Sequence, residues 1–235
     1  MEAIILAGGV GSRLKAVVPD VPKPMAPING RPFLEYLLNY WAGQGVSRFV
    51  LSVGYKCQII EEYFSARHKE AEVVYAVEEQ PRGTGGGLLL ALEGLRGSDS
   101  FLVMNGDTFF EVDLALMRRY HQDRRAEVTI ALREVEANSR YASVEIDKDG
   151  KITAFDNRAR TSGRALINGG VYLAERYAFA GMVPESNEPV SIEDQLYPRM
   201  LVAGKRMYGF PSFGRFIDIG IPEDYRRAAA LLPRA

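Results

Sequence analysis

A glycine-rich loop directly after an apolar run is the feature that most constrains how this chain folds. The run Ala3–Leu6 predicts a buried first strand, and glycines occupy three of the four positions in 8–11. Glycine allows a sharp turn and lets backbone N–H groups approach a bulky anion. Arg13 and Lys23 add two cations to the same region. This combination favours a loop that binds and polarises a triphosphate.

Two common phosphate-binding motifs do not fit this loop. A Walker-type loop has Lys followed by Ser or Thr directly after its last glycine, and Gly11 is followed by Ser12 and Arg13. A dinucleotide fingerprint counted from Gly9 requires a third glycine where Leu14 stands, with a helix starting at once. Prolines disfavour such a helix, because proline lacks the N–H donor and restricts the residue before it. They are Pro19, Pro22, Pro24 and Pro27.

The first half of the chain alternates between helix and strand patterns. This alternation predicts an α/β fold with a mostly parallel sheet and helices on both faces. Ligands of such sheets bind at the carboxyl ends of the strands, where both the glycine loop and Asp107 fall. The predicted helices are Phe33–Gln44, Cys57–Ala66 and Gly86–Leu95, and the predicted strands are Phe49–Val53, Val73–Val77 and Phe101–Met104.

The second half is richer in strands. We expect a small antiparallel insertion there, with a turn at Asp147–Gly150, and a closing helix over Pro222–Leu232. We find no linker, repeat or low-complexity tract, so residues 1–235 are expected to form a single domain. The predicted strands are Val128–Leu132, Ser143–Ile146, Ile152–Phe155 and Leu166–Leu173.

Composition excludes several classes of partner. Hydrophobic residues make up 47% of the 235 residues and charged residues 25%, with a net charge of −1. Nucleic acid and anionic membranes are therefore not expected partners. No run approaches the ~20 apolar residues of a membrane span, no signal segment is recognisable, and Cys57 is the only cysteine, so we expect a cytoplasmic protein. His68 and His121 are expected on exposed helix surfaces.

Two motifs together resemble a known enzyme family. Leu6–Leu14 reads Leu-Ala-Gly-Gly-x-Gly-x-Arg-Leu, and Pro22–Pro32 reads Pro-Lys-Pro-Met-x-Pro-x-x-Gly-x-Pro. Both resemble the signature of the sugar-1-phosphate nucleotidylyltransferases, or sugar nucleotide pyrophosphorylases. The resemblance implies a Rossmann-like fold and two substrates, a nucleoside triphosphate and a sugar 1-phosphate. In the implied reaction, a sugar-phosphate oxygen attacks the α-phosphorus and pyrophosphate leaves, with Mg²⁺ as cofactor.

This reaction brings two anions together, so the site needs positive charge. The resemblance implies that Arg13 contacts the triphosphate and that Lys23 offsets charge on the α-phosphate. Asp107 matches the metal-binding Asp of the family, although Asn105-Gly106-Asp107 could also form an ordinary turn. Asp218 is the second predicted metal ligand, because a carboxylate flanked by Phe and Ile needs a compensating cation.

A further segment is expected to contact the base and ribose of the nucleotide. The segment 83–87 resembles the family's nucleotide-contacting loop, and Glu78-Glu79-Gln80 precedes it. A carboxylate can accept both donors on the Watson–Crick edge of guanine, so the acids favour GTP, without indicating which of them faces the cleft. The predicted nucleotide-binding residues are Leu6, Ala7, Gly8, Gly9, Gly11, Ser12, Glu78, Gln80, Gly83, Thr84 and Asn105.

The sugar side is expected at Asn168, Gly169 and Glu193, which match sugar-contacting positions of the family. One departure stands out. Many relatives have Phe-x-Glu-Lys-Pro where this chain has Phe-Asp-Asn-Arg at 155–158, so the usual sugar-phosphate lysine is absent. Arg158, assigned to the sugar site, or Arg164 would have to replace it.

Within the family, fragments across nearly the whole chain most resemble the bacterial D-glycero-α-D-manno-heptose-1-phosphate guanylyltransferases. The implied product is GDP-heptose for a surface polysaccharide or glycan. Mannose-1-phosphate guanylyltransferase and hexose-1-phosphate thymidylyl-, cytidylyl- or uridylyltransferases remain alternatives, as does a non-catalytic regulatory subunit that binds nucleotide sugars. A glycosyltransferase is disfavoured, because Asn105 replaces the first acid of Asp-x-Asp. The sequence leaves open whether the chain forms a homodimer.

Overall fold

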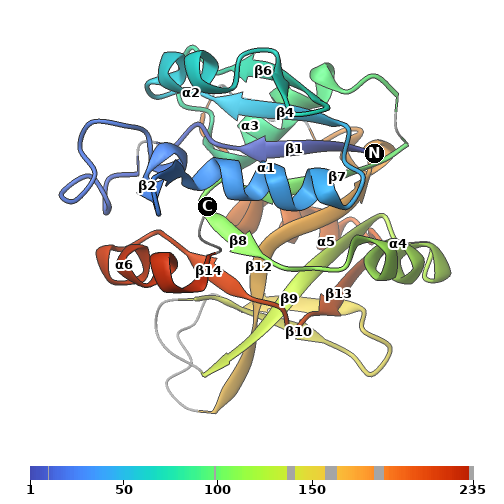
Figure 1. Ribbon diagram of the computed structural model, residues 1–235. Coiled ribbons are helices and arrows are strands. Elements are labelled where there is room, and N and C mark those ends of the chain that lie inside the picture. Colours follow the sequence, from blue (N-terminus) through green and yellow to red (C-terminus); the bar gives the residue numbers. More distant parts are fainter. Residues whose placement is uncertain (10, 98, 137–140, 157–162, 183–187, 233–235) are drawn as a thin grey trace.

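The computed structural model describes residues 1–9, 11–97, 99–136, 141–156, 163–182 and 188–232. Its centre is a mixed ten-stranded sheet in the order β11-β10-β12-β7-β1-β4-β6-β5, with β9 and β13 joined beside β12 (Figure 1). The neighbouring strands β7, β1, β4 and β6 are parallel, as the alternating pattern predicts. They span Ser100–Asn105, Glu2–Leu6, Arg48–Val53 and Ala71–Val77.

The antiparallel strands belong to this same sheet. β12 (Arg164–Glu175) pairs with β7 through its second half and with β9 (Val128–Glu136) along most of its length. A register shift interrupts the β12–β9 pairing between Asn168 and Tyr172. The sheet is completed by β10 (Ser143–Ile146), β11 (Ile152–Asp156), β13 (Met207–Pro211) and the short β5 (Arg67–His68).

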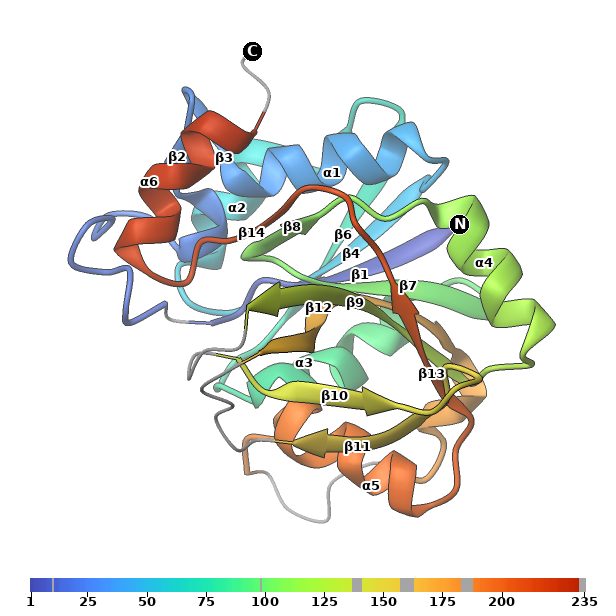
Figure 2. The same cartoon turned by 90° about the horizontal axis from the view of Figure 1, so that it is seen from below.

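Helices cover both faces of the sheet, as Figure 2 shows. Successive residues of β1 point to opposite faces, so Ala3 and Ile5 pack into one hydrophobic cluster and Ile4 into the other. The first cluster lies under α1 (Phe33–Gly43), α2 (Cys57–Phe64), α4 (Leu114–Asp123) and α6 (Pro222–Leu231); the second lies under α3 (Gly83–Ala91) and α5 (Tyr197–Val202).

Several short elements were not predicted. They include the hairpin β2 (Pro27–Ile28) and β3 (Arg31–Pro32), and the pair β8 (Thr108–Phe110) and β14 (Phe216–Asp218). Single helical turns also occur at η1 (Lys23–Met25), η2 (Leu92–Gly94), η3 (Arg176–Phe179) and η4 (Ile192–Leu196). Neither two- and three-residue strands nor single turns leave a detectable hydrophobic period.

The prediction that both histidines lie on exposed helix surfaces is wrong. His121 lies on α4 but is only 3% exposed, and its ring nitrogens lie 2.8 Å from the Thr129 hydroxyl and 3.0 Å from a Glu175 carboxylate oxygen. His68 lies on β5, half-buried, 2.9 Å from Oδ1 of Asn39. Burial lowers the pKa of His121, with Glu175 acting in the opposite direction.

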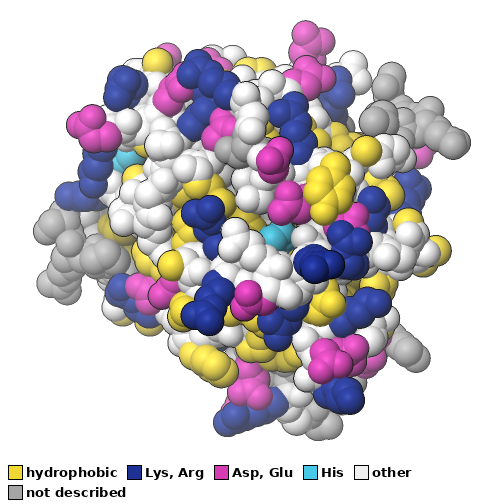
Figure 3. All heavy atoms as spheres, turned by 90° about the vertical axis from the view of Figure 1, so that its right-hand side faces the viewer, with side chains coloured by type: hydrophobic (Ala, Val, Ile, Leu, Met, Phe, Trp, Pro, Cys, Tyr) yellow, Lys and Arg dark blue, Asp and Glu magenta, His cyan; other side chains and the backbone are white. Residues whose placement is uncertain are grey.

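Charged side chains of both signs occur on the surface. Figure 3 shows basic and acidic side chains interspersed over one face of the molecule rather than gathered by sign. None of the helices in the described ranges is long and apolar enough to cross a membrane.

Candidate active site

Three adjoining pockets open where β1 and β7 end. The loop pocket is lined by Leu6, Ala7, Gly9, Gly11, Ser12, Arg13, Lys23, Pro24, Thr84, Asn105, Asp107 and Gly220. The Glu78 pocket is lined by Leu6, Gly8, Gly9, Ser52, Glu78, Pro81, Gly83 and Thr84. The Glu193 pocket is lined by Arg13, Asn105, Asp107, Thr108, Tyr141, Ala142, Ser143, Val144, Phe155, Ile167, Asn168, Gly170, Glu193, Phe216 and Asp218.

Shared residues join these pockets into one cleft. The loop pocket shares Leu6, Gly9 and Thr84 with the Glu78 pocket, and it shares Arg13, Asn105 and Asp107 with the Glu193 pocket. In the sheet, β1 lies between β4 and β7. After β1 the chain first adds strands on the β4 side and later adds β7 on the other side, so the strand order reverses at β1. This is the point of an open parallel sheet where a crevice forms.

An ion pair lies at the centre of the cleft. Lys23, on η1, contacts the Asp107 carboxylate with its ammonium group, and its side chain is only 11% exposed. Gly11 has a φ of +62°, and a Cβ there would lie 2.8 Å from Cβ of Lys23. The glycine therefore allows the two arms of the loop to pack closely against each other.

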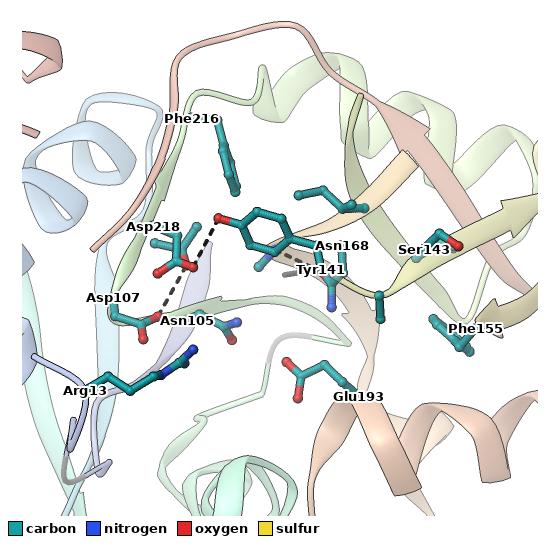
Figure 4. Close-up of a pocket in the computed structure, with 15 residues that line it drawn as sticks. Arg13, Asn105, Asp107, Tyr141, Ser143, Phe155, Asn168, Glu193, Phe216 and Asp218 are labelled. Carbon is teal, nitrogen blue, oxygen red and sulfur yellow. Dashed lines mark hydrogen bonds between the residues drawn. The ribbon is translucent and has the colours of Figure 1, made fainter. Parts of the chain in front are cut away.

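Asp218 reaches the same wall from the far end of the chain. In the β8–β14 pair, Asp218 lies opposite Thr108, and the N–H of Ile219 donates to the Asp107 carbonyl at 3.0 Å. One Asp218 oxygen accepts from the N–H of Gly220 at 2.6 Å. The carboxylates of Asp107 and Asp218 and the side chain of Arg13 thus lie together at one side of the pocket (Figure 4).

These two carboxylates fit a Mg²⁺ site of the kind that uses substrate oxygens. Mg²⁺ is usually held by one or two carboxylates, with water and phosphate oxygens completing its six ligands. Within the described residues, no cluster of three or more His, Cys, Asp and Glu side chains could hold a metal. Asp107 and Asp218, which line the same pocket, are the candidate ligands.

Of the three residues 78–80, Glu78 lines the cleft. Its Oε1 accepts from the Ser52 hydroxyl at 3.1 Å, and its Oε2 accepts from the N–H of Arg82 at 2.9 Å. A Cβ at Gly8 would lie 2.6 Å from Oε1, so the glycine loop packs directly on this carboxylate. Glu79 and Gln80 are exposed and line none of the three pockets, and Gln80 was a predicted nucleotide contact.

The glycine-rich segment after Glu78 is helical rather than a loop, because α3 begins at Gly83 and not at Gly86. Glycine has a low helix propensity, but a larger side chain would not fit at these positions of α3. A Cβ at Gly83 would lie 2.5 Å from the Val190 carbonyl oxygen, and one at Gly87 would lie 2.6 Å from Glu78. The glycines therefore let α3 pack closely against two neighbouring segments.

A chain of side-chain hydrogen bonds connects two residues that line the Glu193 pocket, Asn168 and Glu193. The Asn168 amide donates to the Tyr172 hydroxyl at 2.8 Å, and this hydroxyl donates to Oε1 of Glu193 at 3.2 Å. Burial, and then the Glu193 charge, raise the pKa of Tyr172 well above its usual range. Asn168 and Glu193 were predicted sugar contacts, whereas Tyr172 was not among the predicted site residues.

The other predicted sugar contacts are distributed differently. Gly169 does not line the pocket, because it packs where a Cβ would lie 2.4 Å from the Phe110 ring; Gly170 lines it instead. Arg158 lies outside the described residues. Arg164 pairs with Glu134 at 3.1 Å, is 74% exposed and lines none of the pockets.

Aromatic side chains that were not predicted also line this pocket. Tyr141 lies over the pocket with its hydroxyl 3.5 Å from an Asp218 oxygen, and Phe216 packs edge-on beside it (Figure 4). Phe155 lies at the opposite end, stacked on Tyr197. Phe155 and Phe216 lie on strands, where aromatic residues usually pack in the core, so the sequence pattern alone carries no signal for a pocket at these two positions.

Comparisons with known proteins agree with this geometry. The chain is 41% identical over 228 residues to the D-glycero-alpha-D-manno-heptose 1-phosphate guanylyltransferase of Aneurinibacillus thermoaerophilus, covering 97% of this chain and 96% of that protein. It is 36% identical to the enzyme of the same name from Campylobacter jejuni, covering 96% and 97%. The crystal structure of HddC from Yersinia pseudotuberculosis complexed with GMP-PN superposes with a TM-score of 0.83 at 34% identity, covering 97% and 98%.

The family model described as "Nucleotidyl transferase" matches residues 2–234, which is nearly the entire chain. The match includes every segment that contributes to the cleft, from the glycine loop to Asp218. The chain therefore belongs to the nucleotidyl transferase family.

Proposed function

We propose that this enzyme transfers a guanylyl group from GTP to D-glycero-α-D-manno-heptose 1-phosphate, giving GDP-heptose and pyrophosphate. One observation carries the transfer chemistry: Arg13, Lys23, Asp107 and Asp218 meet where the loop pocket joins the Glu193 pocket. A triphosphate over the glycine loop and a sugar phosphate in the Glu193 pocket would meet at this junction. The product would serve as a precursor of a surface polysaccharide or glycan.

In the proposed reaction, an oxygen of the sugar phosphate forms a bond to the α-phosphorus of GTP. The bond from that phosphorus to the bridging oxygen breaks, and pyrophosphate leaves with the electron pair. The attacking phosphate is already ionised, so no general base is needed. Arg13 would contact several phosphate oxygens through its guanidinium fork, and Lys23 would offset charge that develops on the α-phosphate.

Asp107 and Asp218 would hold Mg²⁺ through their carboxylates. The ion, when bound, supplies positive charge that offsets the repulsion between the two anionic substrates. Before substrates bind, the Lys23 ammonium is the cation beside Asp107. Lys23 is therefore already positioned in the part of the cleft where the negative charge of both substrates would gather.

Glu78 supports guanine as the base. Its carboxylate lines the pocket beyond the glycine loop, on the side away from the Glu193 pocket. Guanine presents N1–H and N2–H₂ side by side, and a carboxylate can accept from both. The heptose assignment is supported by the near-full-length relatives rather than by any single residue. Reaction in the cytoplasm agrees with Cys57, which is free and buried.

Pyrophosphate release with Mg²⁺ tests this proposal, using GTP, dTTP, UTP and CTP crossed with heptose, mannose and glucose 1-phosphates. We expect the highest kcat/KM for GTP with the heptose. Efficient turnover of a different pair would refute the proposed substrates while leaving the transfer chemistry intact. Nucleotide binding without turnover of any pair would instead favour a regulatory subunit.

A further inference from the structure

The N-terminal turn of α3 and the segment 190–193 are joined by backbone hydrogen bonds. The N–H of Gly85 donates to the Val190 carbonyl at 2.7 Å, and the N–H of Val190 donates to the Arg82 carbonyl at 2.8 Å. The close approach leaves no space for a Cβ at Gly83 or Gly85. Two segments about a hundred residues apart in the sequence therefore form one wall of the cleft.

Thr84 joins these two segments through its side chain. Its hydroxyl oxygen accepts from the N–H of Ile192 at 2.8 Å and lies 3.2 Å from Oε2 of Glu193. A threonine hydroxyl has one proton, and a carboxylate can only accept. The Thr84 proton is therefore donated to Glu193, and both functions of the hydroxyl are used.

The second oxygen of Glu193 is held from the other side. The N–H of Gly170 donates to Oδ1 of Asn168 at 2.9 Å, which fixes the orientation of the amide. Its NH₂ group must then donate to the Tyr172 hydroxyl, whose own proton goes to Oε1 of Glu193. Thr84 and Tyr172 thus hold one carboxylate oxygen each, and the Ser191 hydroxyl lies farther from Oε2, at 3.4 Å, and closer to Asp194, at 3.0 Å. Further lone pairs of Glu193 are left for hydroxyls in the pocket.

Thr84 itself does not line the Glu193 pocket. It lines the loop pocket and the Glu78 pocket, where the triphosphate and base are proposed to bind. We propose that Thr84 is a positioning residue that holds the Glu193 carboxylate ready for the sugar, so that nucleotide bound against α3 orders the sugar site as well. This inference rests on the proposed function for the location of the two substrates.

Steady-state kinetics of Thr84→Val tests the inference, because valine has the same shape but no hydroxyl. We expect KM for the sugar phosphate to rise about tenfold, the size of one lost hydrogen bond to a charged group, and to rise by more than KM for the nucleotide. Thr84→Ser keeps the hydroxyl and should restore the wild-type KM. If Thr84→Val fails to fold by circular dichroism, Thr84→Ala replaces it with the same expectation.

A double-mutant cycle with Glu193→Ala separates positioning from a general effect. In the Glu193→Ala background, Thr84→Val should leave the sugar-phosphate KM unchanged, because the carboxylate that Thr84 positions is gone. In the wild type, a non-hydrolysable GTP analogue should increase the affinity for the sugar phosphate, and Thr84→Val should reduce this coupling.

Three outcomes would overturn the inference. The first is a rise in nucleotide KM alone, which would mean that Thr84 acts directly on the nucleotide. The second is an unchanged sugar-phosphate KM in Thr84→Val, and the third is full additivity with Glu193→Ala. All assays use whichever substrate pair the wild type turns over best, so a different sugar would refute the proposed substrates without deciding the role of Thr84.

Discussion

Replacing Glu78 with Gln tests whether this residue reads guanine. Oε2 of Glu78 accepts from the N–H of Arg82, and a backbone N–H can only donate. In Glu78→Gln the amide oxygen must take that position, so the NH₂ group replaces Oε1. The variant would then present donors where guanine also presents donors. The change alters hydrogen bonding without altering the size of the side chain.

The magnitude follows from the number of hydrogen bonds lost. A hydrogen bond to a charged group contributes about 1.5–3 kcal/mol, and the lower figure applies to this open pocket. Glu78→Gln removes one of the two acceptors, and loss of one such bond corresponds to about 1.5 kcal/mol, or a roughly tenfold fall in kcat/KM for GTP. ITP lacks the exocyclic amine of guanine and makes only one of the two bonds. The wild type should therefore prefer GTP over ITP by about tenfold, and Glu78→Gln should show little preference.

The assay is pyrophosphate release with GTP and ITP at saturating sugar phosphate and Mg²⁺. Glu79→Gln is the matched control, because Glu79 precedes the same turn but is exposed and lines none of the pockets. Its GTP/ITP ratio should equal that of the wild type. If Glu78→Gln keeps the full preference for GTP while remaining folded, the carboxylate does not read the base and the reasoning fails.

Three further predictions follow from the site and the core. Asp107→Ala and Lys23→Ala should each lower kcat at least about 10²-fold while thermal melting changes little, and normal turnover would contradict their roles. Gly169→Ala should lower the free energy of unfolding by about 1–3 kcal/mol in urea denaturation, because the new Cβ would meet the Phe110 ring at 2.4 Å. Burial lowers the pKa of His121, so the unfolded chain binds that proton more tightly, and stability should fall as pH drops below the ordinary value of 6.5. His121→Gln should lack that part of the pH dependence, and identical pH profiles would refute the assignment.

The parallel half of the fold could be predicted from the sequence within a few residues per element. Strands such as β1 and β4 are buried on both faces and therefore read as continuous apolar runs, which the flanking loops delimit. The pair β8 and β14 escaped prediction for the opposite reason. Each has three residues, and only their pairing with each other, about a hundred residues apart, makes them strands.

In the candidate site, too, local sequence patterns could be predicted and tertiary contacts could not. Arg13, Lys23 and Asp107 follow strand ends, where a sequence reading expects ligands, and the structure brings them together. Glu78 could be selected over Glu79 only from the structure, because the selection depends on hydrogen bonds from Ser52 and Arg82. A local pattern does not contain such tertiary contacts.

Strand direction sets a further limit on what the sequence could predict about the Glu193 pocket. β12 is antiparallel to β7, so its carboxyl end lies at the opposite edge of the sheet from the cleft. Its contribution comes from mid-strand instead: between the pairs Asn168–Leu132 and Tyr172–Ile130, four steps along β12 match two along β9. The extra residues form a bulge, where Gly170 adopts a φ of +70°. The bulge turns Asn168 toward Tyr172 and thus toward Glu193, so an antiparallel strand lines a pocket that its end could not reach.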